Sequence, residues 1–159
     1  MTILVLGLGN ILLSDEGVGV RVVEALQERY RIPDGVDVVD GGTSGMDMLD
    51  MIANRDHLIV VDAVNTGAPP ATVIRLTGEA VPVFFRSKIS PHQLGLSDVL
   101  AALRLLESEP AGITLIGIVP AALDLGLELS PTIAAKLDDL VGMVRAELDT
   151  LGFPLTPRE

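Results

Sequence analysis

Short apolar runs rich in β-branched residues alternate with helical patterns along most of this chain, and this alternation restricts the fold more than any other feature of the sequence. Such an alternation is typical of βαβ units, in which a largely parallel sheet is covered by helices on both faces. The sequence therefore predicts an α/β domain. Its strands are expected at residues 2–6, 36–40, 58–62, 72–76 and 113–118.

Helices are expected between most of these strands, marked by apolar residues that recur at three and four positions. They are predicted at residues 16–30, 46–53 and 91–106, with a last one from Pro131 to the residue before Gly152. The fourth strand has proline and glycine on both sides and no helix before it, which indicates an antiparallel edge strand. Residues 151–159 are expected to form a loosely held tail.

Length, charge and cysteine content exclude several classes of protein. A chain of 159 residues suits one domain that spans residues 1–159. Its net charge of −11 disfavours binding to nucleic acid or to anionic membrane surfaces. Cysteine is absent, which excludes disulfides and thiol ligands and fits a reducing compartment. With no basic leader and no apolar run of roughly 18 residues, we expect a cytoplasmic protein.

The stretch GLGNILLSDEG, residues 7–17, begins like a dinucleotide-binding loop after the first strand. Gly7 and Gly9 fit the G-x-G-x-x-G pattern, but Leu12 stands where the last glycine belongs. Asp15 and Glu16, at the start of the following helix, would repel a pyrophosphate. A Walker lysine motif is missing as well. The loop is therefore a poor nucleotide site.

Four polar residues are expected to converge outside the carboxyl ends of the strands, where function collects in open α/β sheets. Glu16 follows the first strand, Asp40 and Asp62 end the second and third, and His92 begins a helix after the fourth. His57 precedes the third strand and belongs at the opposite end, so it is expected to be a surface histidine without a functional role.

Glu16, Asp62 and His92 together would form an oxygen and nitrogen site for a borderline divalent ion such as nickel, zinc or manganese. The stretch Ser90-Pro91-His92-Gln93 has the form of a capping box, which places His92 in a first helical turn where its imidazole tends to stay neutral. Each residue also has a structural interpretation. Glu16 can favour the helix dipole, Asp62 can cap a turn, and His92 can be a solvated cap residue.

The turn Asp40-Gly41-Gly42-Thr43-Ser44-Gly45 allows positive φ angles and a close approach of a peptide backbone. Asp40 is placed there to accept a proton or to recognise a basic side chain. The turn is not the G-x-S-x-G elbow of serine hydrolases, and the chain contains no H-E-x-x-H of zinc proteases.

The motifs together resemble those of the hydrogenase maturation endopeptidases, which process nickel–iron hydrogenases. The matching stretches cover the chain in the order of the family: GLGNILLSDEGVGV (7–20), DGGTSGMDML (40–49), NRDHLIVVDAV (54–64), SPHQLGL (90–96), GIVP (117–120) and GLELSP (126–131). One departure is Val119, where relatives often carry glutamine, and it is expected to affect local substrate contacts at most.

The resemblance implies a three-layer α/β/α sandwich around a five-stranded, mostly parallel twisted sheet. It also implies an endopeptidase that removes the C-terminal extension of the hydrogenase large-subunit precursor after nickel insertion. The metal ligands implied are Glu16, Asp62 and His92, with nickel supplied by the bound precursor and other divalent ions able to occupy the site. Asp40 is implied in catalysis or recognition, and the turn residues Gly41, Gly42 and Thr43 are expected to bind substrate.

Two other functions stay open at this point. A non-catalytic nickel-binding maturation chaperone would use the same carboxylates and imidazole without hydrolysis. A nucleotide-dependent enzyme is disfavoured by the opening loop. We expect the protein to act as a monomer on a protein substrate.

Overall fold

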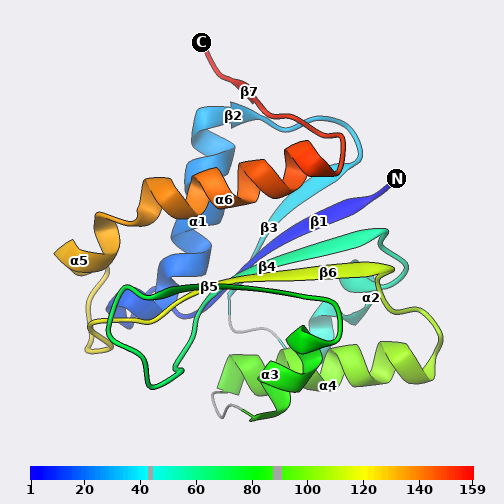
Figure 1. The fold of residues 1–159 in the computed structure, drawn as a ribbon, viewed down its shortest axis with the longest axis horizontal. Helices are drawn as coiled ribbons and strands as arrows, with labels where there is room; N and C mark the ends of the chain where they lie inside the picture. Colours follow the sequence, from blue (N-terminus) through cyan, green and yellow to red (C-terminus); the bar gives the residue numbers. More distant parts are fainter. Residues whose placement is uncertain (43–44, 88–90) are drawn as a thin grey trace.

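A five-stranded sheet occupies the middle of the structure, a computed structural model that describes residues 1–42, 45–87 and 91–159 (Figure 1). Its strand order is β3-β1-β4-β6-β5, with β5 antiparallel to β6 at one edge and the other pairs parallel. The strands are β1 (Ile3–Leu8), β3 (Val36–Gly42), β4 (His57–Ala63), β5 (Val73–Thr77) and β6 (Gly112–Ile118). All five predicted strands and the antiparallel edge strand are confirmed.

Helices cover both faces of the sheet, which confirms the predicted α/β/α sandwich (Figure 1). On one face lie α1 (Val18–Arg29) and α6 (Leu137–Thr150), and on the other α2 (Leu49–Ile52), α3 (Ala80–Ser87) and α4 (Pro91–Leu105). Shorter elements are the 3-10 turns η1 (Ser14–Gly17) and η2 (Met46–Met48), the helix α5 (Pro131–Ala134), and a two-stranded ribbon of β2 (Tyr30–Arg31) and β7 (Thr156–Pro157).

The interior strand β1 is apolar without a break because both of its faces are buried. Ile3 and Val5 pack into the core under α1 and α6, whereas Leu4 and Leu6 pack into the core under α2, α3 and α4. Side chains alternate between the two faces of a strand, so each strand supplies both cores. This alternation also shows which layer a functional residue faces.

Helix α3 is the main element that the sequence analysis missed. No helix was predicted between residues 76 and 91, where Pro82 is the third residue of α3, a position at which a backbone N–H has no partner within the helix. Val81 and Phe85, four residues apart, are fully buried and hold α3 on the sheet.

Two expectations about the C-terminal part were wrong in detail. The last helix is divided, because the amide of Lys136 bonds three residues back to Ile133 and tightens the turn between α5 and α6. The tail is not loosely held. Leu155 is buried, β7 pairs with β2, and Arg158 donates a backbone bond to Arg29.

No helix in the part of the chain that the structure describes combines the length and the apolar character needed to cross a membrane.

The glycines of the first loop let backbone lie against backbone at the carboxyl ends of β1 and β4. Gly9 has a φ of 126°, and a Cβ there would overlap the carbonyl oxygen of Glu16. A Cβ on Gly19 would overlap the carbonyl oxygens of Val61 and Leu8. The start of α1 therefore rests directly on the sheet. These glycines serve the close packing of the helix against the sheet.

We predict that Gly19→Ala lowers the free energy of unfolding by about 2 kcal/mol or more, because the rigid backbone oxygens of Val61 and Leu8 leave no room for a methyl group. Gly142→Ala is the matched control, since Gly142 lies in α6 with no atom near its missing Cβ. That variant should gain up to about 1 kcal/mol from helix propensity. Urea denaturation of both variants measures the difference, and equal stabilities would contradict the close approach.

Candidate functional site

Asp62 lies at the carboxyl end of β4 and is fully buried. Leu58 and Val60, four and two residues earlier on the strand, pack into the core under α2, α3 and α4. By strand alternation, Asp62 points into the same layer, toward the helices that include α4. A carboxylate is expected at this strand end, and the alternation adds that it faces the layer that contains α2, α3 and α4.

Glu16 lies in η1, the turn between β1 and α1, and is half-buried. η1 contacts β4, and Gly19, three residues after Glu16, abuts Val61, the neighbour of Asp62 in sequence. The backbone thus brings the turn of Glu16 to the end of the strand that carries Asp62. The predicted helix over 16–30 is confirmed, although its first turn is a 3-10 turn.

His92 lies in the first turn of α4, which begins at Pro91 as the sequence predicted. Gly95, three residues later, lies 4.0 Å from the Cβ position of Gly45, and Gly45 follows the carboxyl end of β3. The beginning of α4 is therefore at the same edge of the sheet as Asp62. The side chain of His92 and all of Ser90 lie outside the part of the chain that the structure describes.

Among the side chains that the structure describes, no three His, Asp or Glu residues gather closely enough to hold a metal ion. The predicted set of Glu16, Asp62 and His92 includes one side chain beyond that part, so it stays a prediction. The backbone places its three members on η1, β4 and α4 at one edge of the sheet.

Asp40 lies near the end of β3, the strand at one edge of the sheet, and its side chain is exposed. Its Oδ1 accepts a hydrogen bond from the amide of Gly42 at 2.8 Å. Val36 and Val38 pack under α1 and α6, so alternation places Asp40 on that face and Asp62 on the other. Because Gly7 pairs with both Asp40 and Val61 across neighbouring strands, the two backbones are about 10 Å apart.

The turn after Asp40 has the backbone form expected from its glycines. Gly42 has a φ of 51°, and its carbonyl accepts a bond from the amide of Gly9 at 2.8 Å. Gly41 is buried, and a Cβ there would press on Leu6. Thr43, predicted to bind substrate, lies outside the described residues. The turn is thus held by the loop that leads to Glu16.

Asp15, next to Glu16, is fully buried and organises the loop after β6. Its Oδ2 accepts bonds from the amides of Ala121 and Ala122 and from the hydroxyl of Ser130, at 2.8–2.9 Å. Its Oδ1 accepts the amide of Ser130 at 2.7 Å. From the sequence alone, Asp15 is expected only to repel a phosphate. Its partners are more than 100 residues away, so no local pattern in the sequence could have identified this role.

Val119 is buried in the interior, with backbone bonds to Thr72 and Ala71. Its side chain packs inside the protein, and the expectation that this position bears at most on local substrate contacts stays a prediction.

His57 lies at the opposite end of the sheet, as expected, but it is half-buried rather than a surface side chain. Its Nε2 lies 2.9 Å from the hydroxyl of Thr114. Burial lowers the pKa of His57, Glu147 counteracts this effect, and Arg75 adds to it. The residue belongs to a polar cluster under α6.

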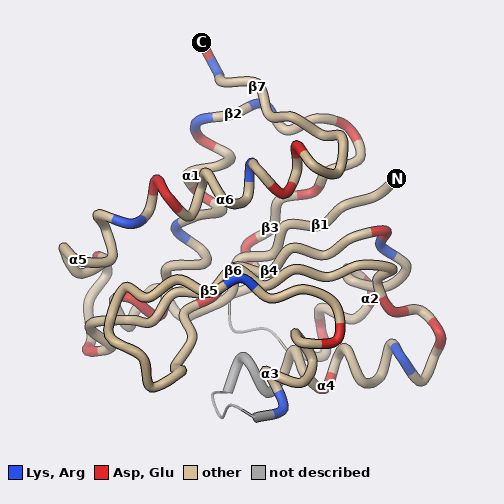
Figure 2. Tube along the Cα trace, in the orientation of Figure 1, with Lys and Arg blue, Asp and Glu red and all other residues tan. Residues whose placement is uncertain are grey.

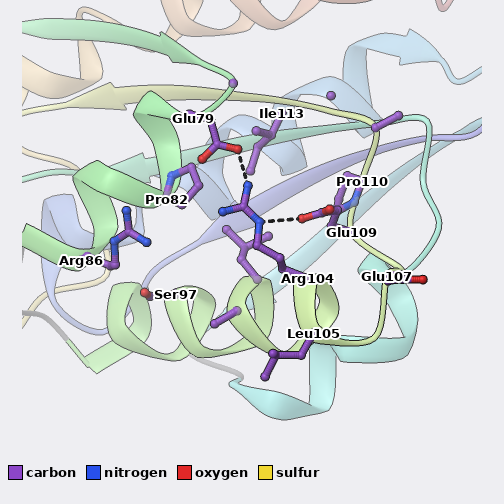
Figure 3. Close-up of a pocket in the computed structure, with 15 residues that line it drawn as sticks. Glu79, Pro82, Arg86, Ser97, Arg104, Leu105, Glu107, Glu109, Pro110 and Ile113 are labelled. Carbon is purple, nitrogen blue, oxygen red and sulfur yellow. Dashed lines mark hydrogen bonds and ion pairs between the residues drawn. The ribbon is translucent and has the colours of Figure 1, made fainter.

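A groove of about 730 Å³ lies between α3, α4 and the start of β6, away from the carboxyl ends of the strands (Figure 3). Arg104 spans it with hydrogen bonds to Glu79 and Glu109 (Figure 3). Because these groups are paired with one another and lie near the amino end of the sheet, the groove is separate from the site of Glu16 and Asp62.

Comparison with known proteins identifies the family. The family described as HycI, hydrogenase maturation protease, matches residues 20–147. The hydrogenase 2 maturation protease of Escherichia coli is 51% identical over 160 residues, which covers 100% of this chain and 98% of that protein. The chain belongs to the hydrogenase maturation protease family.

Solved structures of this family have the same fold. The hydrogenase maturating endopeptidase HybD of Escherichia coli superposes with a TM-score of 0.97 at 50% identity, over 99% of this chain and 98% of that one. The maturation protease HybD of Thermococcus kodakarensis gives a TM-score of 0.76 at 28% identity, over 92% and 99% of the two chains. The recognised family and its protease activity are thereby confirmed.

We predict that Asp15→Ala lowers the free energy of unfolding by about 3 kcal/mol, because three backbone amides and a hydroxyl lose their buried acceptor. Asp15→Asn should cost less, since it keeps one carbonyl oxygen. Asp149→Ala, at an exposed position of α6, should stay within about 0.5 kcal/mol of the parent. Chemical denaturation measures all three, and a change in Asp15→Ala as small as that in the control would contradict the bracing role.

Proposed function

We propose that this maturation protease removes the C-terminal extension of a nickel-loaded hydrogenase large-subunit precursor, and that Glu16, Asp62 and His92 receive the nickel of the precursor. The nickel arrives as part of the substrate, and other divalent ions can occupy the same ligands. Membership of the hydrogenase maturation proteases supports the processing activity.

The observation that carries the metal part of this proposal is the position of Asp62. This carboxylate is fully buried at the carboxyl end of β4, and it points into the layer of α4, whose first turn holds His92. Buried carboxylates in proteins are hydrogen-bonded or coordinate a metal, and Asp62 is placed to take part in metal binding at this edge.

The donor types fit the proposed ion. Two carboxylates and one imidazole suit a borderline divalent metal and leave coordination positions for ligands from the precursor. The first turn of α4 places His92 at the positive end of a helix dipole, which favours a neutral imidazole as a metal ligand.

The turn from Asp40 to Gly45 supplies a place for the scissile peptide beside these ligands. Gly45, at the end of this turn, lies near the start of α4, so the turn is at the same edge of the sheet. The glycines of the turn let a substrate backbone approach. Hydrolysis consumes one water: the oxygen bonds to the carbonyl carbon, the C–N bond breaks, and a proton passes to the leaving amine. A substrate-held metal can polarise that carbonyl or the attacking water.

Two roles of Asp40 in this reaction are considered, first that of a proton acceptor and second that of the residue that shapes the turn. The bond from the amide of Gly42 to its Oδ1 supports the second role, as does its position on the face opposite to Asp62. We therefore propose that Asp40 positions the turn and its bound peptide. The role of proton acceptor that the sequence suggested is the competing outcome of the test below.

A non-catalytic nickel chaperone would use the same ligands but would leave the mass of the precursor unchanged apart from metal. The related proteins named proteases and endopeptidases favour hydrolysis over this alternative.

We predict that Glu16→Gln, Asp62→Asn and His92→Gln each slow cleavage of the nickel-loaded precursor by about 100-fold or more, because each removes one donor to the metal. The measurement is the mass of the precursor over time. His57→Gln, which changes the other histidine at the far end of the sheet, and Asp149→Asn are the matched controls and should cleave at the parental rate.

The same assay includes the precursor without nickel, which the parent protein should leave intact. Cleavage of both forms at one rate would contradict recognition through the metal. Transfer of nickel without any cleavage would instead support the chaperone.

We predict that Asp40→Asn keeps most of the activity, because its amide oxygen can still accept the bond from Gly42, whereas Asp40→Ala loses about tenfold or more. Initial rates on nickel-loaded precursor compare the two variants. If Asp40→Asn is as inactive as Asp40→Ala, Asp40 acts as a proton acceptor and the positioning role is wrong.

A further inference from the structure

Four exposed leucines, the leucine rim, lie on two loops beside the candidate site: Leu12, Leu123, Leu125 and Leu127. Leu12 belongs to the loop that leads from β1 to Glu16, and the other three belong to the loop between β6 and α5. Each is more than half exposed. In Figure 1 the two loops lie together at the carboxyl ends of the strands.

The backbone that carries the rim is firmly held. Gly126 forms a parallel bridge with Leu13, donating its amide to the carbonyl of Leu12 and accepting the amide of Ser14, both at 2.9 Å. The hydroxyl of Ser14 bonds to the carbonyl of Asp124 at 2.7 Å, and Arg21 bonds to that of Leu127 at 2.5 Å. Asp15 braces both ends of the same loop. The leucines are therefore presented in a fixed arrangement, which lowers the entropy cost of binding.

Single exposed leucines are ordinary on protein surfaces, but a group of four on two bonded loops forms a surface suited to a partner. Acidic residues lie among them, since Asp124 and Glu128 are exposed and residues 121–130 contain no Lys or Arg. Across the whole chain, acidic residues outnumber basic ones by 22 to 11 (Figure 2). The rim thus combines apolar contact area with negative charge.

We propose that the leucine rim docks an apolar segment of the hydrogenase precursor that is flanked by lysine or arginine. This inference rests on the proposed function, because it takes the precursor as the partner. The position of the rim supports the precursor as the partner, because the segment after β1 carries both Leu12 and Glu16. A protein bound at the rim is therefore next to the candidate site. A second copy of the chain fits less well, because each copy carries a charge of −11 and would bring Asp124 and Glu128 against the same acids.

The test is binding of purified nickel-loaded precursor to Leu125→Ser/Leu127→Ser, measured by calorimetry. The matched control is Leu105→Ser/Leu106→Ser at the far end of α4, because Leu105 is 86% exposed against 83% for Leu125, and Leu106 63% against 61% for Leu127. The rim variant should bind about tenfold or more weakly, and the control within about twofold. In cleavage, KM should rise while kcat at saturation stays within about twofold.

Charge is tested with Asp124→Asn/Glu128→Gln against Asp139→Asn/Asp149→Asn on α6. The first pair should weaken binding and reduce its dependence on salt, and the second pair should do neither. Melting temperatures of all variants confirm that they are folded.

Equal binding by the rim variant and its control overturns the docking surface, as does a dimer of the parent protein that only the rim variant loses. If the parent binds the precursor without cleaving it, the proposed function fails, while weaker binding by the rim variant still supports the rim. If the parent cleaves the precursor and the rim variant binds and cleaves it equally well, the proposed function stands and the docking surface is overturned.

Discussion

The close backbone contact between the start of α1 and the ends of β1 and β4 is the constraint on which the rest of the structure depends. Gly19 abuts the carbonyl oxygens of Val61 and Leu8, so no side chain can separate helix from sheet there. This contact sets η1 over the end of β4 and brings the turn of Glu16 to the strand of Asp62. The same first loop fixes the Gly42 turn through the amide of Gly9. One glycine-rich loop thus organises both halves of the candidate site.

Asp15 extends this organisation to the far side of the site. A carboxylate buried without solvent is unfavourable unless its oxygens are satisfied, and Asp15 meets that condition with four hydrogen bonds to the loop after β6. Two adjacent acids in η1 therefore have different roles. Asp15 points inward and holds a loop, whereas Glu16 lies at the edge of the sheet. The loop that Asp15 braces is the one that exposes most of the leucine rim.

The sequence predicted the sheet well because both faces of its strands are buried, and long apolar runs in Val, Ile and Leu have few other structures available. The placement of the backbone of Glu16, Asp62 and His92 at one edge of the sheet also followed, since parallel strands put their carboxyl ends together. What could not be predicted depends on contacts between distant residues. Asp15 shows this most clearly, and so does the ribbon that ties the tail to β2. Helix α3 was missed because Pro82 is compatible with a helix only in its first turn, and the sequence does not show where that turn begins.

The proposed function gives a physical reason for a site without cysteine. Thiolates bind nickel strongly, and a protease that presented them could remove the ion from its substrate instead of recognising it. Carboxylates and a neutral imidazole bind such an ion more weakly and release it with the product. Weak metal contact alone would give little affinity for a large protein, however, so the remaining binding free energy has to come from elsewhere on the surface. A rigid apolar rim next to the proposed ligands would meet that need, because it would add affinity for the protein part of the substrate and leave the discrimination of metal to Glu16, Asp62 and His92.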